Sequence, residues 1–421
     1  MNISINYLFA SIIMEFKMKK VAIINSVIDY GSTGLLTRQL YEYGCLNGCD
    51  AFVFFGRGKK KEDDRIIRID SKLDFYFHKI MTLITGYQGL FSRFATKRLI
   101  EYLKKEKINN VILLNLHGYY LNEKQLLSYL KDNKIKTVYI TPDEYAGLGK
   151  CCYSKDCNQY KMECKKCPYI HDYPKSLWFD RSNYFFKMKK ELYSEFNTLV
   201  FVGPESNLVK FRESALIKDK PMIRASWGID LNYYKYEINE KIYSKYHIPK
   251  EKIIVLTVAK YSDDRKGVKR YFFEIAKRLQ NSEYHFINVG YDGNLRPEEI
   301  PTNMTLIGYM DNQKELAQIY SLSDAYLLAS TTDTMPISCL ISFACETPIC
   351  CFYTSGLKYL ADRDSKAVQY CDELTVDALQ TTICSMKKKT SESMHECRKL
   401  AMNEYSIDAF NRKVFGVLEG E

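Results

Sequence analysis

The chain has 421 residues, of which 46% are hydrophobic and 27% charged, a composition typical of a globular protein long enough for two domains. Its formal net charge of +10 is dispersed, and no helix-turn-helix, RNP or zinc-finger pattern accompanies it, so we expect no nucleic acid partner. No apolar stretch is long enough to span a bilayer, which favours a cytoplasmic protein.

Residues 1–17 are mildly apolar, but they lack the basic region and the cleavage site of a signal peptide. Met18-Lys19-Lys20 leads directly into a strand-like run. We therefore expect Met18 to be the true start and the preceding residues to be an extension of the gene model.

Short apolar runs alternate with helix-like segments along the chain. The runs are continuous, which is typical of strands buried on both faces of a parallel sheet. The alternation predicts a doubly wound α/β fold. The predicted strands are Val21–Ser26, Ala51–Gly56, Val111–Leu116, Thr137–Thr141, Thr198–Val202, Ile253–Ala259, His285–Gly290, Met304–Tyr309, Ala325–Leu328 and Pro348–Phe352. The predicted helices include Ala95–Lys105, Glu123–Asn133, Arg270–Gln280 and Lys314–Ser321.

This rhythm stops over residues 226–250, which are rich in Tyr and Lys and contain no strand-like run. We predict a first domain over 18–225, a hinge over 226–250, a second domain over 251–390 and a helical tail over 391–421 that packs back toward the first domain. Two such domains predict a ligand cleft between them, at the carboxyl ends of the strands.

A glycine-containing turn, Gly31-Ser32-Thr33-Gly34, follows the first predicted strand. Backbone N–H groups at the start of the next helix can hold a diphosphate or sugar oxygens. The spacing is neither G-x-G-x-x-G nor Walker A, and many turns of this kind are only tight connections.

Two segments, Phe75–Ile84 and Tyr184–Phe196, combine aromatic residues with Lys. Basic amphipathic helices can lie on anionic lipid, so peripheral membrane contact is one interpretation. Ordinary helices that face the core explain the same pattern, and we prefer that interpretation.

Four cysteines, Cys151, Cys157, Cys164 and Cys167, are spaced C-x5-C-x6-C-x2-C. Four thiolates within so short a segment can surround a structural zinc ion, and they leave no open position for a catalytic one. Disulfides and unliganded packing remain alternatives.

The predicted strand Ile253–Ala259 leads to Arg265-Lys266-Gly267. Two cations near the carboxyl end of a buried strand could neutralise a departing diphosphate. A solvated basic turn is the alternative.

In order and spacing these segments resemble glycosyltransferase family 4, and the resemblance covers nearly the whole chain from Met18. The string from Leu116 to Asn122 is similar to a bacterial polysaccharide-forming subgroup, whose members also carry cysteines at matching positions. The other matching segments are Gly31–Gly34, Gly56–Gly58, Ser92–Ile100, Arg265–Gly267, and Glu315–Tyr320 through Asp324 to Ser330.

The resemblance implies a GT-B fold, with two doubly wound domains facing a cleft. It implies transfer of a sugar from a nucleotide-sugar donor to a glycan or lipid-linked acceptor, with retention and no catalytic metal, in the cytoplasm or at the inner face of the membrane. Arg265 and Lys266 would stabilise the departing diphosphate, and His117 and Tyr119 would lie on the acceptor side. The donor would contact Gly31, Ser32, Gly34, Asp333, Thr334 and Met335.

The chain departs from the family at four positions. Pro142-Asp143 stands where the family has His-Asp, so Asp143 alone would orient the sugars. Ile341 replaces the acidic residue that holds the ribose, and losing that hydrogen bond costs roughly 1.5–3 kcal/mol, or ~10- to 100-fold in binding. Glu346 replaces a glycine, and Trp227 replaces an asparagine.

These departures leave other functions open. A catalytically impaired relative that acts as a binding or scaffolding subunit would fit Pro142 and Ile341, although the retained Arg265 and Lys266 oppose it. A sugar-phosphate phosphorylase is disfavoured, because no lysine motif for pyridoxal phosphate is present.

Overall fold

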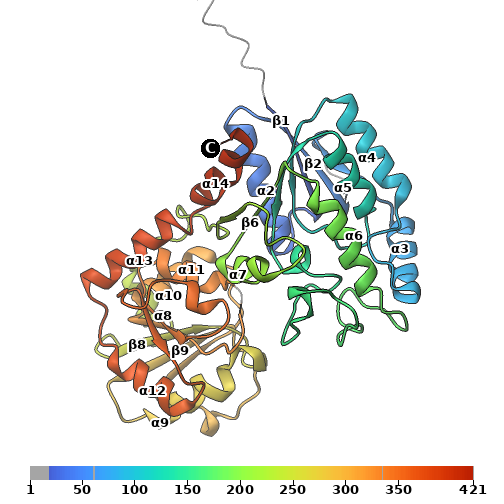
Figure 1. The fold of residues 1–421 in the computed structure, drawn as a ribbon. Helices are drawn as coiled ribbons and strands as arrows, with labels where there is room; N and C mark the ends of the chain where they lie inside the picture. The colour runs from blue at the N-terminus through green and yellow to red at the C-terminus, as the bar shows by residue number, and fades with distance from the viewer. Residues whose placement is uncertain (1–18, 60–61, 334, 421) are drawn as a thin grey trace, which may run out of the picture. The chain divides into compact units, whose positions relative to one another are not determined.

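The computed structural model describes residues 19–59, 62–333 and 335–420 (Figure 1). The chain divides into two compact units. The first contains the described residues up to Val202, Lys210–Ile223 and the residues from Val414. The second contains Gly203–Val209 and Arg224–Lys413. Met18 and Thr334 lie outside the described residues.

The first unit is built on a seven-stranded sheet of order β3-β2-β1-β4-β5-β6-β7, and the pairs from β3 to β6 run parallel. Residues at the centre of β1 are fully buried, as the continuous apolar run predicts. In Figure 1, α4, α5 and α6 lie side by side on one face of the sheet, and α2 lies on the other. The strands are β1 (Lys20–Val27), β2 (Asp50–Arg57), β3 (Ile66–Arg68), β4 (Asn110–Leu113), β5 (Lys136–Ile140), β6 (Leu199–Gly203) and β7 (Met222–Arg224). The helices are α2 (Gly31–Leu46), α3 (Lys72–Thr85), α4 (Arg93–Lys105), α5 (Glu123–Asp132) and α6 (Ser182–Ser194), with short 3-10 turns at Tyr145–Gly147 and Gln159–Lys161. The helix α7 (Glu205–Glu213) is divided, because its residues up to Val209 belong to the second unit.

The second unit is built on a parallel six-stranded sheet of order β10-β9-β8-β11-β12-β13. Its strands are β8 (Ile253–Val258), β9 (Tyr284–Val289), β10 (Met304–Ile307), β11 (Ala325–Leu328), β12 (Ile349–Phe352) and β13 (Val368–Cys371). Its α-helices are α8 (Glu240–Lys245), α9 (Glu274–Arg278), α10 (Gln313–Leu322), α11 (Ile337–Ala344), α12 (Val376–Ser385) and α13 (Ser391–Asn403). The helix α14 (Ile407–Glu419) begins in this unit, and its residues from Val414 belong to the first. Shorter turns are η3 (Asp264–Lys266), the π-helical η4 (Val268–Phe273), η5 (Pro297–Glu299) and η6 (Leu357–Tyr359).

Residues 226–250, which lack strand-like runs and were expected to form a hinge, belong to the second unit. Ile229, Ile242 and Ile248 are buried in its apolar core. The helical tail is divided between the units. Residues up to Lys413 belong to the second, whereas Phe415 packs against Gly44 of the first, with its ring centroid 5.2 Å from that of Tyr43.

Within the described part of the chain, no helix combines the length and apolar character needed to cross a bilayer. The segment Tyr184–Phe196 lies largely in α6, and its Phe185, Phe186, Tyr193 and Phe196 are buried. Most aromatic residues of this segment therefore face the core, whereas Tyr184 is 39% exposed.

Candidate functional site

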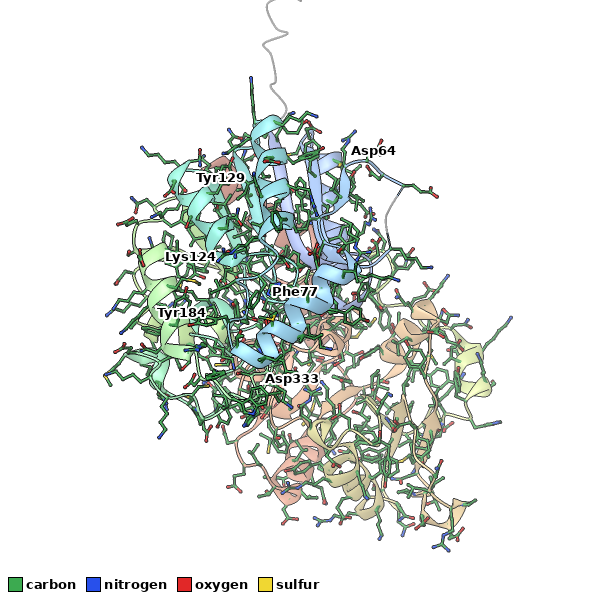
Figure 2. All side chains as sticks on the ribbon, turned by 90° about the vertical axis from the view of Figure 1, so that its right-hand side faces the viewer. Asp64, Phe77, Lys124, Tyr129, Tyr184 and Asp333 are labelled. Carbon is green, nitrogen blue, oxygen red and sulfur yellow. The ribbon has the colours of Figure 1, made fainter. Side chains whose placement is uncertain are left out.

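Three residues predicted to act on the donor come together in the second unit. Arg265 and Lys266 lie in η3, which follows β8, and Asp333 lies in the loop after β11, the strand that pairs with β8. Lys266 Nζ lies 2.6 Å from Asp333 Oδ2, and Arg265 Nη1 lies 3.5 Å from the same oxygen. The carboxyl ends of neighbouring parallel strands thus place two cations around one carboxylate (Asp333 is labelled in Figure 2).

The turn that carries Arg265 and Lys266 is held by close backbone packing. Gly267 has a φ of +66°, and a Cβ atom at this position would lie 2.4 Å from the carbonyl oxygen of Ala329. The Ser330 hydroxyl donates a hydrogen bond to the carbonyl of Arg265 at 3.2 Å. Glycine is therefore required for η3 to approach the end of β11 this closely.

The two cations of this cluster are paired with carboxylates. The side chains of Lys266 and Asp333 are 19% and 13% exposed, so their attraction is screened less than that of a surface pair. Arg265 is 53% exposed and can reorient. Arg265 also lies 3.6 Å from Asp263 Oδ2, so two carboxylates balance the two cations here. A diphosphate group would take the place of these carboxylates beside Arg265 and Lys266.

The rest of the predicted donor loop is less polar. Met335, predicted to contact the donor, has its side chain in the apolar core of the second unit, so it could offer a ligand only its backbone. Ile341 on α11 is buried in the same core and provides no acceptor for a ribose hydroxyl. Glu346 has a φ of +57°, the left-handed region that favours glycine.

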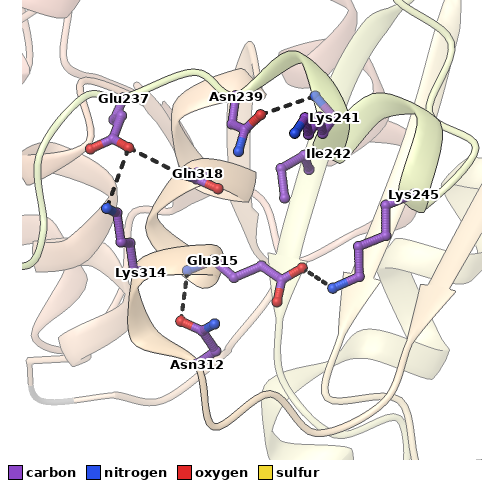
Figure 3. A pocket seen from close by; sticks show the side chains of 9 residues that line it. All are labelled: Glu237, Asn239, Lys241, Ile242, Lys245, Asn312, Lys314, Glu315 and Gln318. Carbon is purple, nitrogen blue, oxygen red and sulfur yellow. Dashed lines mark hydrogen bonds and ion pairs between the residues drawn. The ribbon is translucent and has the colours of Figure 1, made fainter.

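Residues of the Glu315–Asp324 segment have structural roles. Glu315 and Gln318 line a surface pocket of about 420 Å³, where Gln318 donates to Glu237 at 3.1 Å and Glu315 pairs with Lys245 (Figure 3). Asp324 accepts a hydrogen bond from the N–H of Ile254 at 2.9 Å, which ties α10 to the start of β8.

In the first unit, His117 and Asp143 form a hydrogen-bonded pair. They follow β4 and β5, which are neighbours in the sheet, and His117 Nε2 lies 2.7 Å from Asp143 Oδ2. The second carboxylate oxygen accepts from the N–H of Tyr145 at 3.0 Å, so the carboxylate is fixed. The other ring nitrogen of His117 lies 3.3 Å from the Tyr173 hydroxyl.

Cys152 and Tyr173, which border this pair, were not predicted as site residues. A ligand atom of Cys152 lies within 4.8 Å of those of His117 and Asp143, and burial raises the pKa of the Cys152 thiol well above its usual range. Tyr119 lies beside Tyr173, with ring centroids 5.9 Å apart, and burial raises its pKa to about 12. Both missed residues come from a loop without periodicity, so no sequence signal links them to His117.

The Gly56-Arg57-Gly58 motif places a cation near this group. A Cβ atom on Gly56 would lie 2.2 Å from that of Tyr120, so the end of β2 can pass Tyr120 only with glycine. The Arg57 guanidinium lies 5.7 Å from the ring centroid of Phe75 on α3. Its buried Nε has no hydrogen-bond partner.

Gly31–Gly34 form the first turn of α2 rather than a separate loop. Tyr30 precedes the helix and provides no side-chain cap, so the first N–H groups are not capped locally. A Cβ atom on Gly34 would lie 3.2 Å from the backbone nitrogen of Asp29. Close packing thus accounts for Gly34, and contact of this turn with a donor stays a prediction.

The four cysteines of the predicted zinc site are free thiols in the structure. A hydrogen bond between Cys151 and Cys167 raises the pKa of Cys151 and lowers that of Cys167. Among the described residues, His117, Asp143 and Cys152 are the one group whose ligand atoms all lie within 4.8 Å of one another. No three of the four cysteines meet that criterion, so a zinc ion would have to draw them closer, and zinc stays a prediction.

Comparisons with known proteins relate part of this chain to glycosyl transferases. Residues 252–386 match the family model described as "Glycosyl transferases group 1", which supports a group 1 glycosyltransferase for this part of the chain. A putative colanic acid biosynthesis glycosyl transferase, WcaC of Escherichia coli, is 25% identical over 198 residues. That match covers 39% of this chain and 48% of WcaC, about half the length of the curated relative.

Solved structures share the fold across both units. A glycosyltransferase from Rickettsia africae superposes with a TM-score of 0.62 at 12% identity, covering 96% of this chain and 100% of that one. Anabaena Alr3699/HepE in complex with UDP gives 0.58 at 12% identity, covering 96% and 100%. The two parallel-sheet α/β units therefore have the GT-B fold, as predicted.

Proposed function

We propose that this protein is a glycosyltransferase of family 4 that moves a sugar from a nucleotide-sugar donor to a glycan or lipid-linked acceptor in surface-polysaccharide biosynthesis. The observation that carries the proposal is the Arg265–Lys266–Asp333 cluster, which lies inside the segment similar to group 1 glycosyl transferases. We place the reaction in the cytoplasm or at the inner face of the membrane.

The cluster suits the departure of a nucleoside diphosphate. The bond from the anomeric carbon to the diphosphate oxygen breaks, an acceptor oxygen bonds to that carbon on the same face of the sugar, and the acceptor's proton is released. Lys266 and Arg265 would stabilise the charge that grows on the diphosphate, an effect that is largest in the transition state. No catalytic metal is needed in this scheme.

The Asp333 carboxylate has two possible partners in such a complex. It pairs with Lys266, and it would accept a hydrogen bond from a hydroxyl of the donor sugar as Lys266 turns to the diphosphate. The backbone at Met335 would add a donor contact within the second unit, and Thr334, which lies outside the described residues, stays a predicted contact. Donor contact by Gly31, Ser32 and Gly34 in the first unit is a separate prediction.

The His117–Asp143 pair supplies an imidazole that Pro142 cannot. His117 reaches Asp143 from the end of the preceding strand in the sheet, and Asp143 fixes the orientation of its ring. We assign the pair to the sugars near the acceptor, with Tyr119 beside it. Pro142 stands after β5 where the resembling family has a histidine. His117, which follows the neighbouring strand β4, would thus supply an imidazole in its place.

Two measurements test the proposal. The first is calorimetric titration of the protein with UDP and GDP, and the second is a hydrolysis screen of UDP-, GDP- and ADP-sugars. UDP is the first candidate because it is bound in the Anabaena structure. We expect measurable but weak binding, ~10- to 100-fold below that of a site with a ribose acceptor, because Ile341 cannot accept a hydrogen bond. Absent or millimolar binding of every nucleotide, with no hydrolysis, would overturn the assignment and favour a non-catalytic scaffolding subunit.

A further inference from the structure

The outer face of α3 carries an apolar stripe that the fold leaves uncovered. Leu73, Tyr76, Phe77, Ile80 and Ile84 are 83%, 58%, 57%, 52% and 41% exposed. At 3.6 residues per turn they fall within an arc of roughly 100°. Figure 2 looks onto this helix, with Phe77 labelled on its outer side. Five large exposed side chains on one helix face are more than the scattered surface hydrophobics of ordinary proteins.

Most of this stripe is not needed to hold the helix in place, although Phe77 also contacts Phe91, with ring centroids 6.1 Å apart. The opposite face of α3 is anchored by His78 and Thr82, both fully buried. The Ser92 hydroxyl lies 2.8 Å from His78 Nδ1, and the ring of Phe91 lies 5.4 Å from that of His78. The start of α4 is thereby held against α3, and it adds Phe94, which is 80% exposed.

The surroundings of the stripe are basic. Lys72 and Lys79 border it on α3, and Arg93 and Lys97 are exposed beside Phe94 on α4. Over residues 72–98 the sequence contains one carboxylate, Asp74, and that carboxylate lies 3.1 Å from the Ser71 hydroxyl at the N-terminus of α3. One turn farther along α4, Glu101 lies 3.9 Å from Lys97 Nζ and partly offsets its charge, which leaves Lys72, Lys79 and Arg93 as the main cations.

We propose that this surface, the outer face of α3 with the start of α4, docks on a bilayer that contains anionic lipids. The apolar side chains would enter the boundary between headgroups and acyl chains, and the cations would face the anionic headgroups. A convex apolar stripe bordered by cations fits the plane of a membrane. A protein partner that covered it would need to present carboxylates around an apolar groove.

The inner face of α3 gives the docking surface a place in the proposed reaction. Phe75 and His78 contact Tyr119, with ring centroids 6.1 and 5.8 Å apart, and Tyr119 borders the His117–Asp143 pair through Tyr173. One helix thus separates the lipid-facing stripe from the residues assigned to the acceptor. This extension to a lipid-linked acceptor rests on the proposed function, whereas the docking itself does not.

Co-sedimentation with vesicles of phosphatidylcholine alone, or mixed with phosphatidylglycerol, tests the docking without any sugar nucleotide. We expect binding to the mixed vesicles that weakens as salt is added. Phe77→Glu with Ile80→Glu should lower the partition coefficient by at least about tenfold. Lys72→Gln and Lys79→Gln should each lower it by roughly fivefold. Leu46→Glu, on an exposed leucine at the end of α2, is the matched control and should bind as wild type.

Circular dichroism melting of each variant separates lost docking from lost folding. Absence of wild-type binding to the mixed vesicles, or binding that the α3 substitutions leave unchanged in folded protein, would overturn the proposal. The main alternative is that the stripe forms a contact between two copies of the protein, which light scattering can detect. Self-association that disappears with the same substitutions would support that alternative and overturn the membrane proposal. Because the vesicles carry no donor, a negative hydrolysis screen leaves this result unaffected.

Discussion

Lys266 Nζ and Asp333 Oδ2 lie 2.6 Å apart, so a departing diphosphate must compete with a carboxylate for this cation. The competition favours the transition state, in which the diphosphate carries more charge than in the bound donor. The same pairing fixes the lysine near the reaction, which limits the entropy lost when the anion forms.

Removing this cation should therefore affect rate more than binding. Lys266→Ala is expected to lower donor turnover by ~100-fold or more, a typical effect of losing one electrostatic stabiliser, with a much smaller change in nucleotide affinity by calorimetry. Lys277→Ala, which removes an exposed lysine on α9, is the control and should keep wild-type turnover. Equal turnover of the two variants would show that Lys266 is not part of the reaction.

A second residue-scale prediction concerns Asp70, which precedes the cap of α3. Burial and the nearby Asp74 raise the pKa of Asp70 to about 7, and one of its carboxylate oxygens is buried without a hydrogen-bond partner. Between the ordinary carboxyl pKa of 3.8 and about pH 7, the folded state then binds more protons than the unfolded state. Stability contributed by this group is therefore lost as pH rises through that window, by on the order of 3–4 kcal/mol at pH 8.

Asp70→Asn should remove that loss. Urea unfolding should show the variant more stable than wild type at pH 8 and nearly equal to it at pH 4. Asp64→Asn, at an exposed carboxylate of the same region (labelled in Figure 2), should follow the wild-type pH dependence. A stability gain for Asp70→Asn that is the same at both pH values would contradict the linkage.

At the scale of single elements, α11 ends in a strained residue. Cys345 closes the helix, and Glu346 then takes the left-handed conformation that helices commonly assign to glycine at this position. A residue with a Cβ atom pays roughly 1–2 kcal/mol for that conformation. The left-handed backbone conformation explains why glycine suits this position. This chain keeps the same conformation with Glu346 in place of glycine.

Glu346→Gly should accordingly raise the free energy of unfolding by about 1 kcal/mol, measured by urea denaturation. Glu346→Ala removes the same charge but keeps the Cβ atom, so it should show no such gain. If the alanine variant gained as much as the glycine variant, the charge of Glu346 rather than its backbone would be the source.

The strands were predictable where the sequence carries a continuous apolar run, as in Val21–Ser26 and Ile253–Ala259. All ten predicted strands are present within a few residues. The strands β3, β7 and β13 were missed because each is only three or four residues long and includes polar or charged positions. The predicted helix Arg270–Gln280 is divided, because a π-helical turn precedes α9.

The candidate site was also predictable only in part. Arg265, Lys266 and Asp333 could be predicted because each follows a recognisable strand in a familiar motif. His117 and Asp143 could be named singly, but their hydrogen bond depends on β4 and β5 being neighbours, which one sequence does not reveal. Tyr173 and Cys152 come from an irregular loop, whose path depends on tertiary packing.

For the molecule as a whole, the cysteine-rich loop offers the clearest test of a structural metal. If Cys151, Cys157, Cys164 and Cys167 bind zinc, purified protein should contain about one zinc per chain, and chelation should lower its melting temperature. Cys164→Ser should lose the metal, whereas Cys45→Ser on α2 should retain it. The zinc content of each protein is measured by mass spectrometry. Protein whose melting temperature is the same with and without chelator would exclude a structural zinc.

Residues after Val414 complete the first unit, and Phe415 fills the space beside Gly44. During translation, Tyr43 leaves the ribosome long before its ring partner Phe415 does, by roughly 20–70 s at ordinary elongation rates of about 5–20 residues per second. The first sheet can form in that interval, but the flank of α2 must wait for the second unit to be synthesised. The nascent chain therefore leaves the Tyr43–Gly44 flank of α2 uncovered for most of its synthesis.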